Sequence, residues 1–143
     1  MPSARSASRN SSLRGWESVT VPGQVAGWVS LSERFGQLPF EDLFADAIRH
    51  ARDGFPVSPV IGRQWALAVA ELKGLPGFEA FMPRGRAPVA GEIWRFPDQA
   101  TTLEEIARTR GESFYRGPLA GAITDFALKH GAVLCRADLE AHR

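Results

Sequence analysis

The sequence predicts a mainly α-helical fold, and three features of the chain favour that class. From Pro22 onward, apolar residues mostly recur three and four positions apart, which is the spacing along one face of a helix. The breaks in this pattern fall at glycine or proline, where a helix ends. The chain has 143 residues, 44% of them hydrophobic, which is enough to bury one core. We therefore expect one helical unit over residues 15–143, preceded by a separate tail.

The first three predicted helices cover residues 22–35, 39–53 and 58 or 59–73. Each is followed by a glycine, and we expect Gly36 to take the left-handed conformation that stops a helix. The expected inward faces are, in order, Val25, Trp28, Val29, Ser32 and Phe35; Leu43, Phe44, Ala47, Ile48 and Ala51; and Ile61, Trp65, Ala68, Val69 and Leu72.

The second half of the chain predicts an irregular connection followed by further helices. Residues 75–97 mix prolines and glycines with aromatic residues, which is typical of a packed connection, and a short helix is expected near Glu79. Residues 100–111 and 118–131 each predict a helix. The chain closes with a short apolar run and a helix begun near Asp138. The expected apolar face of the helix within 118–131 is Leu119, Ile123, Phe126 and Ala127.

Charge, cysteine content and hydropathy exclude several classes of protein. Lys and Arg number 17 against 16 Asp and Glu, and this net charge of +1 gives no strong attraction for nucleic acid. The single cysteine, Cys135, permits no internal disulfide and no zinc cluster, and we expect it to be a small buried apolar residue. No apolar run approaches the roughly 20 residues of a membrane span, and no signal-peptide core is visible. We expect no nucleic-acid partner and no membrane span, and the localisation stays unknown.

Residues 1–14 form the tail, which is rich in serine and contains Arg5, Arg9 and Arg14 but no acidic residue. This composition predicts disorder. A transit peptide and a nucleic-acid-binding arm are alternatives that the composition leaves open.

Asp42, Asp46 and His50 are the first candidates for chemistry, because residues four positions apart share one face of a helix. Two carboxylates and an imidazole in this arrangement are suited to binding a metal or transferring a proton. The same face lies opposite the apolar stripe, and an acid followed four residues later by a base is an ordinary solvated pair. We favour the solvated interpretation. His50 and His130 each also precede a helix end, where a cation is stabilised.

A second candidate is VPGQVAGW, residues 21–28, which places two glycines near a helix start, where unpaired N–H groups attract anions. Neither the G-x-G-x-x-G pattern of dinucleotide sites nor the G-K-[ST] of phosphate loops is present. We favour a structural role, in which Gly27 allows a neighbouring helix to approach closely.

Thr101 and Thr102 are further candidates, because a threonine acts as a nucleophile when its own freed α-amino group serves as base. Their spacing from Glu104 and Glu105 is that of a capping box, S/T-x-x-E, so we expect them to begin a helix.

Cys135 and the pair Arg84 and Arg86 are the remaining candidates for reactivity or binding. As a nucleophile, Cys135 requires a nearby base and an electropositive setting, and the sequence establishes neither. Arg84 and Arg86 are suited to clamping the carboxylate of a ligand, but exposed arginines are common in loops, and we favour an ordinary surface loop.

Five blocks of sequence, taken in order, resemble one enzyme family. They are WESVTVPGQVAGW, FGQLPFEDL, AIRHARDGFPVS, FYRGPLA and LCRADLEAHR. Together they resemble the γ-glutamyltranspeptidases, or glutathione hydrolases, from about Gly15 to the last residue. The resemblance implies an N-terminal-nucleophile hydrolase with an αββα sandwich, made as a precursor that cuts itself before a threonine. It covers only the helical middle of the large subunit, so we expect the central sheets to be absent.

The resemblance assigns no catalytic, substrate-binding or metal-ligating residue and no cofactor to this chain. The family's R-E-x-x-P block, whose arginine holds the glutamate α-carboxylate, is expected ahead of Gly15, and residues 1–14 do not contain it. The T-T-H-[FY]-[SC] block that carries the nucleophile is expected beyond Arg143. Thr101 and Thr102 do not replace it, because Leu103 stands where the family has histidine.

We therefore expect the chain alone to be inactive and to need the missing large-subunit segment and the small subunit as partners. A split, truncated or frameshifted reading frame accounts for this arrangement. The related acylases that open cephalosporin side chains remain an alternative for the parent activity. A second alternative is a non-catalytic helical module that docks a partner through its aromatic residues, and a third is a nonfunctional remnant. The expected docking residues are Trp28, Phe35, Phe44 and Trp65.

Overall fold

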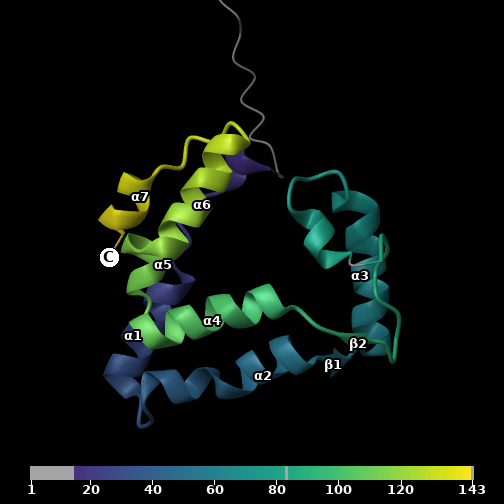
Figure 1. The fold of residues 1–143 in the computed structure, drawn as a ribbon, viewed down its shortest axis with the longest axis horizontal. Helices are drawn as coiled ribbons and strands as arrows, with labels where there is room; N and C mark the ends of the chain where they lie inside the picture. The colour runs from purple at the N-terminus through teal and green to yellow at the C-terminus, as the bar shows by residue number, and fades with distance from the viewer. Residues whose placement is uncertain (1–14, 83, 143) are drawn as a thin grey trace, which may run out of the picture.

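The computed structural model describes residues 15–82 and 84–142, which form an open frame of helices (Figure 1). In this frame α2 and α4 run side by side, α3 stands at one end, and α5, α6 and α7 stand at the other. The tail predicted at residues 1–14 lies outside the described residues. The elements are η1 (Trp16–Ser18), α1 (Gln24–Phe35), η2 (Phe40–Phe44), α2 (Ala45–Asp53), β1 (Phe55–Pro56), α3 (Pro59–Leu72), η3 (Phe78–Phe81), β2 (Ile93–Trp94), α4 (Pro97–Thr109), α5 (Glu112–Arg116), α6 (Pro118–Lys129) and α7 (Arg136–Ala141).

The larger part of the frame, here called the α4 region, comprises residues 16–53 and 97–142. Helix α4 is central to it, because α4 packs against η2, α2 and α5. Its inward face carries Leu103, Ile106 and Ala107, whose spacing places them on one side of the helix. The core that they form with other segments also contains Val25, Phe40, Phe44 and Tyr115.

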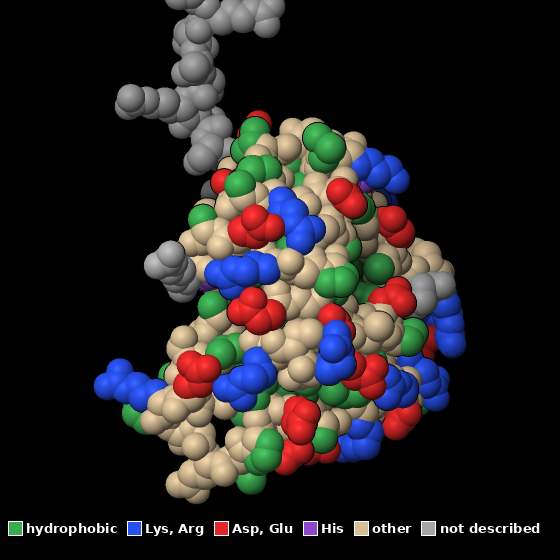
Figure 2. Space-filling view, turned by 60° about the vertical axis from the view of Figure 1, so that its left-hand side comes forward, with side chains coloured by type: hydrophobic (Ala, Val, Ile, Leu, Met, Phe, Trp, Pro, Cys, Tyr) green, Lys and Arg blue, Asp and Glu red, His purple; other side chains and the backbone are tan. Residues whose placement is uncertain are grey.

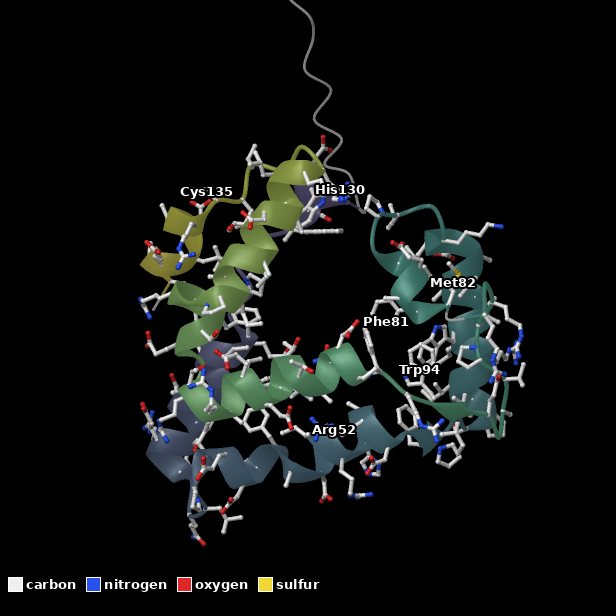
Figure 3. The ribbon with its side chains drawn as sticks, viewed as in Figure 1. Arg52, Phe81, Met82, Trp94, His130 and Cys135 are labelled. Carbon is white, nitrogen blue, oxygen red and sulfur yellow. The ribbon has the colours of Figure 1, made fainter. Side chains whose placement is uncertain are left out.

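The smaller part, here called the α3 region, comprises residues 55–96. Its two short strands pair antiparallel, with Phe55 opposite Trp94 and Pro56 opposite Ile93. Trp65 of α3 packs edge-on against Trp94 with ring centroids 4.5 Å apart, and its Nε1 donates to the Phe81 carbonyl at 3.2 Å. Phe81 and Trp94 lie on the side of α3 that faces the rest of the frame (Figure 3).

The two regions meet at both ends of the frame. At one end the chain passes from α2 through Gly54 into β1, and returns from β2 into α4, where Phe96 N donates to the Ala51 carbonyl at 2.8 Å. At the other end the Phe126 ring of α6 lies 3.3 Å from the position of a β-carbon at Gly77 and 6.0 Å from the Trp16 ring. At this end the contact between the two regions is thus that of Phe126 with Gly77, and Trp16 packs on Phe126 from within the α4 region.

The predicted helices are confirmed at α1, α3 and α6, with small shifts in their ends. The third helix begins at Pro59, one of the two expected starts, and Ser58 caps it, because its hydroxyl accepts from Ile61 N at 3.3 Å. The short helix near Glu79 is η3, and Gly54 ends α2 with a φ of 95°. The sequence did not indicate α5, and α7 begins at Arg136 rather than near Asp138.

Two glycine predictions were wrong. Gly36 has a φ of −68° and a ψ of 143°, so it ends α1 in an extended rather than a left-handed conformation. Glycine is needed there because a β-carbon would lie 2.4 Å from the Ser32 carbonyl oxygen. A β-carbon at Gly27 would meet no described heavy atom within 4 Å, so no helix approaches closely there.

The predicted inward faces were wrong at several positions near the ends of their helices. Residues 40–44 form a 3₁₀-helix, whose three-residue turn rotates Phe40 into the core and Leu43 outward. Four side chains expected inside are exposed because no described segment covers them: Phe35 at 67%, Leu43 at 52%, Ile61 at 42% and Phe126 at 38%. Ala47 is exposed as well.

Candidate functional site

The first candidate site is an apolar groove, here called the α1 groove, which lies between α1, η2 and α4. Its volume is about 480 Å³. Trp28 and Phe44 pack edge-on at 5.8 Å along it, while Leu31 and Phe35 are 60% and 67% exposed. A groove with this lining is suited to apolar side chains of another polypeptide. The lining also includes Phe40, Leu43 and Leu103.

The second candidate is the outer face of α3. The only charged or amide side chains of this helix are Arg63, Gln64 and Glu71. A helix that is apolar on nearly all sides is normally buried. Here Val60 is 66% exposed and Leu67 is 61% exposed. A shallow hollow of about 290 Å³ beside α3 is lined by Ile61, Gln64, Trp65, Ala68 and Phe81.

A third face of the molecule is different. Figure 2 brings forward the side of the frame that carries α5, α6 and α7, where positive and negative side chains alternate between small apolar areas. Ion pairs on these helices include Arg116 with Glu112 and Arg136 with Glu140, all exposed. Such pairs contribute little to stability but keep the surface hydrated, so this face has the character of an ordinary solvent-facing surface.

The aromatic residues expected to dock a partner lie at two places. Trp28, Phe35 and Phe44 line the α1 groove, although Phe44 itself is buried rather than exposed. Trp65 is half-buried in the α3 region. The structure therefore does not bring the four into one surface.

Asp42, Asp46 and His50 are all exposed. Asp42 lies in η2, where the 3₁₀ turn breaks the four-residue spacing from Asp46. Asp46 accepts from Arg49 Nη2 at 3.0 Å, and the His50 ring packs edge-on against Phe55 with centroids 6.5 Å apart. Within residues 15–82 and 84–142, no group of three metal-ligating side chains is arranged to hold a metal ion.

The capping-box prediction for Thr101 and Thr102 was wrong. Helix α4 begins at Pro97, so both threonines lie inside it. Their hydroxyls donate to carbonyls one turn back, Thr101 to Pro97 at 3.3 Å and Thr102 to Asp98 at 3.0 Å. This bonding is common for threonine in a helix interior. Proline begins this helix because its fixed φ suits the first turn.

The prediction for Cys135 was also wrong, because the residue is exposed. It caps α7: its backbone N donates to Asp138 Oδ2 at 2.8 Å, and its side chain accepts from the backbone of Asp138. The hydrogen bond from Cys135 N holds the pKa of Asp138 below its usual value. Cys135 and His130 lie at opposite ends of the connection between α6 and α7 (Figure 3). His130 ends α6, with its ring 4.4 Å from that of Phe126.

Arg84 and Arg86 do clamp a carboxylate, and it belongs to Glu92 of the same loop. Arg86 donates to both Glu92 oxygens at 3.0 Å, and Arg84 pairs with Oε1. Val89 N adds a third partner at 2.8 Å. These donors lower the pKa of Glu92 to about 2, with the Arg86 hydrogen bonds the largest cause.

Tyr115 is the residue that sequence reasoning missed, and it explains the VPGQ segment. Its buried hydroxyl donates to the Pro22 carbonyl at 2.7 Å and accepts from Ala26 N at 3.0 Å. One unpaired N–H of the α1 start is thus satisfied by the protein itself. The FYRG pattern is the only signal that pointed to this position, through the resemblance and not through helical spacing.

No described helix is long and apolar enough to span a membrane.

Solved structures similar to this frame are larger enzymes. The cephalosporin acylase from Bacillus halodurans superposes with a TM-score of 0.86 and 43% identity, over 90% of this chain and 25% of that chain. The γ-glutamyltranspeptidase from Pseudomonas nitroreducens, complexed with L-DON, gives a TM-score of 0.84 and 30% identity, over 94% of this chain and 39% of that chain. The fold is therefore that of a helical part of an N-terminal-nucleophile hydrolase, and in the described residues its only strands are β1 and β2.

Curated relatives agree with the structures. An oxamate amidohydrolase proenzyme of Klebsiella pneumoniae is 39% identical over 87% of this chain, and glutathione hydrolase 3 of Arabidopsis thaliana is 33% identical over 88%. The sequence also matches the family described as Gamma-glutamyltranspeptidase over residues 2–143. The chain belongs to the γ-glutamyltranspeptidase family, which confirms the resemblance. It spans 25% and 20% of the lengths of these two relatives.

Proposed function

We propose that this chain is a helical scaffold segment of the large subunit of a γ-glutamyltranspeptidase-like enzyme and carries none of its catalytic residues. The observation that supports this most directly is the exposure of α3, an almost wholly apolar helix whose Val60 and Leu67 face solvent. The α1 groove is a second uncovered apolar surface. In our proposal, further segments of the enzyme cover both surfaces.

The parent reaction in this proposal is hydrolysis or transfer of the γ-glutamyl group of glutathione and related compounds. An N-terminal threonine on another segment attacks the γ-glutamyl carbonyl, and its own α-amino group serves as the base. The three candidate nucleophiles considered from the sequence have structural roles, since Thr101 and Thr102 are bonded within α4 and Cys135 caps α7. The isolated chain is therefore expected to be inactive.

The test is hydrolysis of γ-glutamyl-p-nitroanilide by the purified chain, alone and after co-expression with segments that carry the family's R-E-x-x-P and T-T-H blocks. We expect no turnover alone and measurable turnover after co-expression. Turnover by the isolated chain contradicts the proposal. Absence of turnover in both, together with no physical association of the segments, contradicts the scaffold role.

A matched pair of variants makes this test sharper. Leu67→Glu places a charge on the exposed apolar face of α3, whereas Arg63→Gln changes a side chain that is already polar on the same helix. We expect Leu67→Glu to abolish co-assembly without altering the stability of the isolated chain, and Arg63→Gln to leave co-assembly intact.

A second candidate for the parent substrate is supported by the relatives themselves. The Klebsiella relative is named for oxamate and the Bacillus structure for cephalosporins. In our proposal, cleavage of oxamate, of an acylated cephalosporin and of a γ-glutamyl compound is in each case attack on an amide carbonyl. Oxamate and an acylated cephalosporin, assayed beside the γ-glutamyl anilide with the same co-expressed protein, distinguish the three substrates.

A non-catalytic docking module is the second candidate function of the chain, and the α1 groove favours it. A monodisperse monomer that does not associate with the added segments favours this alternative over the scaffold role.

A further inference from the structure

We propose that the pocket formed by residues 84–95, here called the arginine pocket, binds a small organic dicarboxylate. The pocket has a volume of about 190 Å³ and is lined by three arginines, one glutamate and apolar side chains. This volume corresponds to the liquid volume of about six water molecules. The site goes beyond the proposed function, and its test requires no amide cleavage.

The pocket has a rigid frame, because Glu92 ties its wall together. Its carboxylate accepts from Arg86 at 3.0 Å to each oxygen and from Val89 N at 2.8 Å. The Glu92 side chain is only 17% exposed, although the guanidinium groups around it are open to solvent. The two arginines are therefore held in place before any ligand arrives, which lowers the entropy lost on binding.

Backbone hydrogen bonds fix the same loop to the α3 region. Val57 N donates to the Glu92 carbonyl at 2.9 Å, and Gly91 N donates to the Val57 carbonyl at 2.8 Å. Val57 is 2% exposed, so these bonds anchor the loop to a buried residue. The pocket wall is thus part of the fold rather than a free surface loop.

The charge of the pocket is not balanced from within. Arg84, Arg86 and Arg95 face one carboxylate, that of Glu92, which leaves two positive charges in excess. Arg95 has no hydrogen-bond or ion-pair partner among the residues that the structure describes. A ligand with two negative charges compensates this excess, and guanidinium groups bind carboxylates through paired hydrogen bonds.

The apolar part of the lining favours an organic anion over an inorganic one. Ile93 lies beside the arginines and is 47% exposed, while the buried Pro88 and Trp94 form the pocket wall behind it. The hydrocarbon body between the two carboxylates of an organic dianion can pack on Ile93, whereas inorganic phosphate has no apolar part to place there. Succinate is accordingly the probe, with acetate and inorganic phosphate as comparison anions.

The experiment is isothermal titration calorimetry of succinate into the full chain at low ionic strength. Arg95→Gln is the test variant, because Arg95 takes no part in holding Glu92. Arg63→Gln is the matched control, since Arg63 is also exposed and without a partner among the described residues but lies on α3 outside the pocket.

We expect succinate to bind more tightly than acetate or phosphate, and to bind less tightly as salt is added. Arg95→Gln is expected to weaken binding about fivefold, the effect of losing one partly exposed charge contact. Arg63→Gln is expected to leave it unchanged. The proposal is overturned by an absence of saturable binding, by equal losses in both variants, or by phosphate binding as tightly as succinate.

Discussion

The α4 region and the α3 region are each built around a helix of similar length, 13 residues in α4 and 14 in α3, but the two helices differ in how they are covered. In the α4 region, Ile106 and Leu139 are at most 3% exposed, and segments from both halves of the chain meet around α4. Among the described residues of the α3 region, the only buried large hydrophobic side chains are Val57 and Trp94. Much of the other side-chain packing in this region consists of aromatic pairs that include Trp65, Phe81 and Trp94.

This difference shows that apolar content alone does not produce a core. Helix α3 is more apolar than α4, yet α4 is buried on one face and α3 remains largely exposed. Local stability depends on the number of buried side chains around an element. We therefore expect the α3 region to open more readily than the α4 region in the isolated chain.

The largest expected effect is the difference in unfolding free energy between two truncations, one in each region. Ile106→Ala removes a side chain that is 3% exposed and leaves a cavity, which costs about 2–5 kcal/mol of unfolding free energy. Leu67→Ala on α3, where the side chain is 61% exposed, costs about 0.5 kcal/mol or less. Chemical denaturation measures both. Equal losses of unfolding free energy in the two variants would mean that the apolar face of α3 is buried in solution. They would contradict the difference in burial between the two regions.

The second prediction concerns Gly54, where the chain leaves the α4 region. Its φ of 95° and ψ of 167° lie where only glycine is comfortable, and a β-carbon would lie 2.7 Å from the Trp94 carbonyl oxygen. Gly54→Ala is expected to cost at least about 1–3 kcal/mol. Gly74→Ala is the control, because a β-carbon there meets nothing within 4 Å and φ is not positive. Thermal unfolding of the two variants checks the difference, and similar melting temperatures refute it.

The third prediction tests the joint between α1 and α5. Tyr115→Phe removes the hydroxyl that bonds the Pro22 carbonyl and Ala26 N, and leaves both without that partner. The expected cost is about 1–2 kcal/mol, within the range for buried polar groups left unpaired. Hydrogen exchange is expected to accelerate in the first turn of α1 and to stay unchanged in α3. Faster exchange in α3 as well would show that the two regions open together.

The smallest expected effect is the acid response of the arginine loop. The pKa of Glu92 is lowered from 4.5 to about 2 by Arg86, Val89 N and Arg84. A lowered pKa adds stability above the unfolded value of 4.5, and this contribution is lost as the pH falls toward 2. Glu92→Gln is expected to remove this pH dependence from the α3 region.

Acid alone does not separate the two regions, because the α4 region has a similar group. The pKa of Glu105 is lowered chiefly by the hydrogen bonds of Arg108. The measurement is therefore the difference between Glu92→Gln and the unsubstituted chain, followed by hydrogen exchange of residues 84–94 between pH 6 and pH 3. An unchanged acid response in the variant would contradict the role given to Glu92.

Much of the helical layout was predictable, because it depends on local signals. Ser58 followed by proline is a local start signal, and the glycines after α2 and α3 are local stop signals. One error arose because the start of α4 was placed about one turn too late. Thr101 and Thr102 match a capping box in sequence, but Pro97 starts the helix earlier and places them inside it.

The candidate sites were predictable only in part. The sequence offered a carboxylate clamp at Arg84 and Arg86 only as the less favoured alternative to a surface loop. It did not indicate Glu92 as the partner, because backbone bonds to Val57 hold the turn that brings Glu92 back to them. Phe35 and Phe40 have the same apolar character, and only the 3₁₀ turn at residues 40–44 decides that Phe40 is buried.

The sequence by itself determined the helical class and the membership in the γ-glutamyltranspeptidase family, since periodicity and ordered motifs are properties of the chain alone. The tertiary structure decided which apolar faces are covered and which side chains pair. Tyr115 illustrates the physical reason, because it satisfies a carbonyl 93 positions earlier in the chain. Burial and hydrogen bonding of this kind depend on segments that are distant in sequence, and helical spacing carries no information about them.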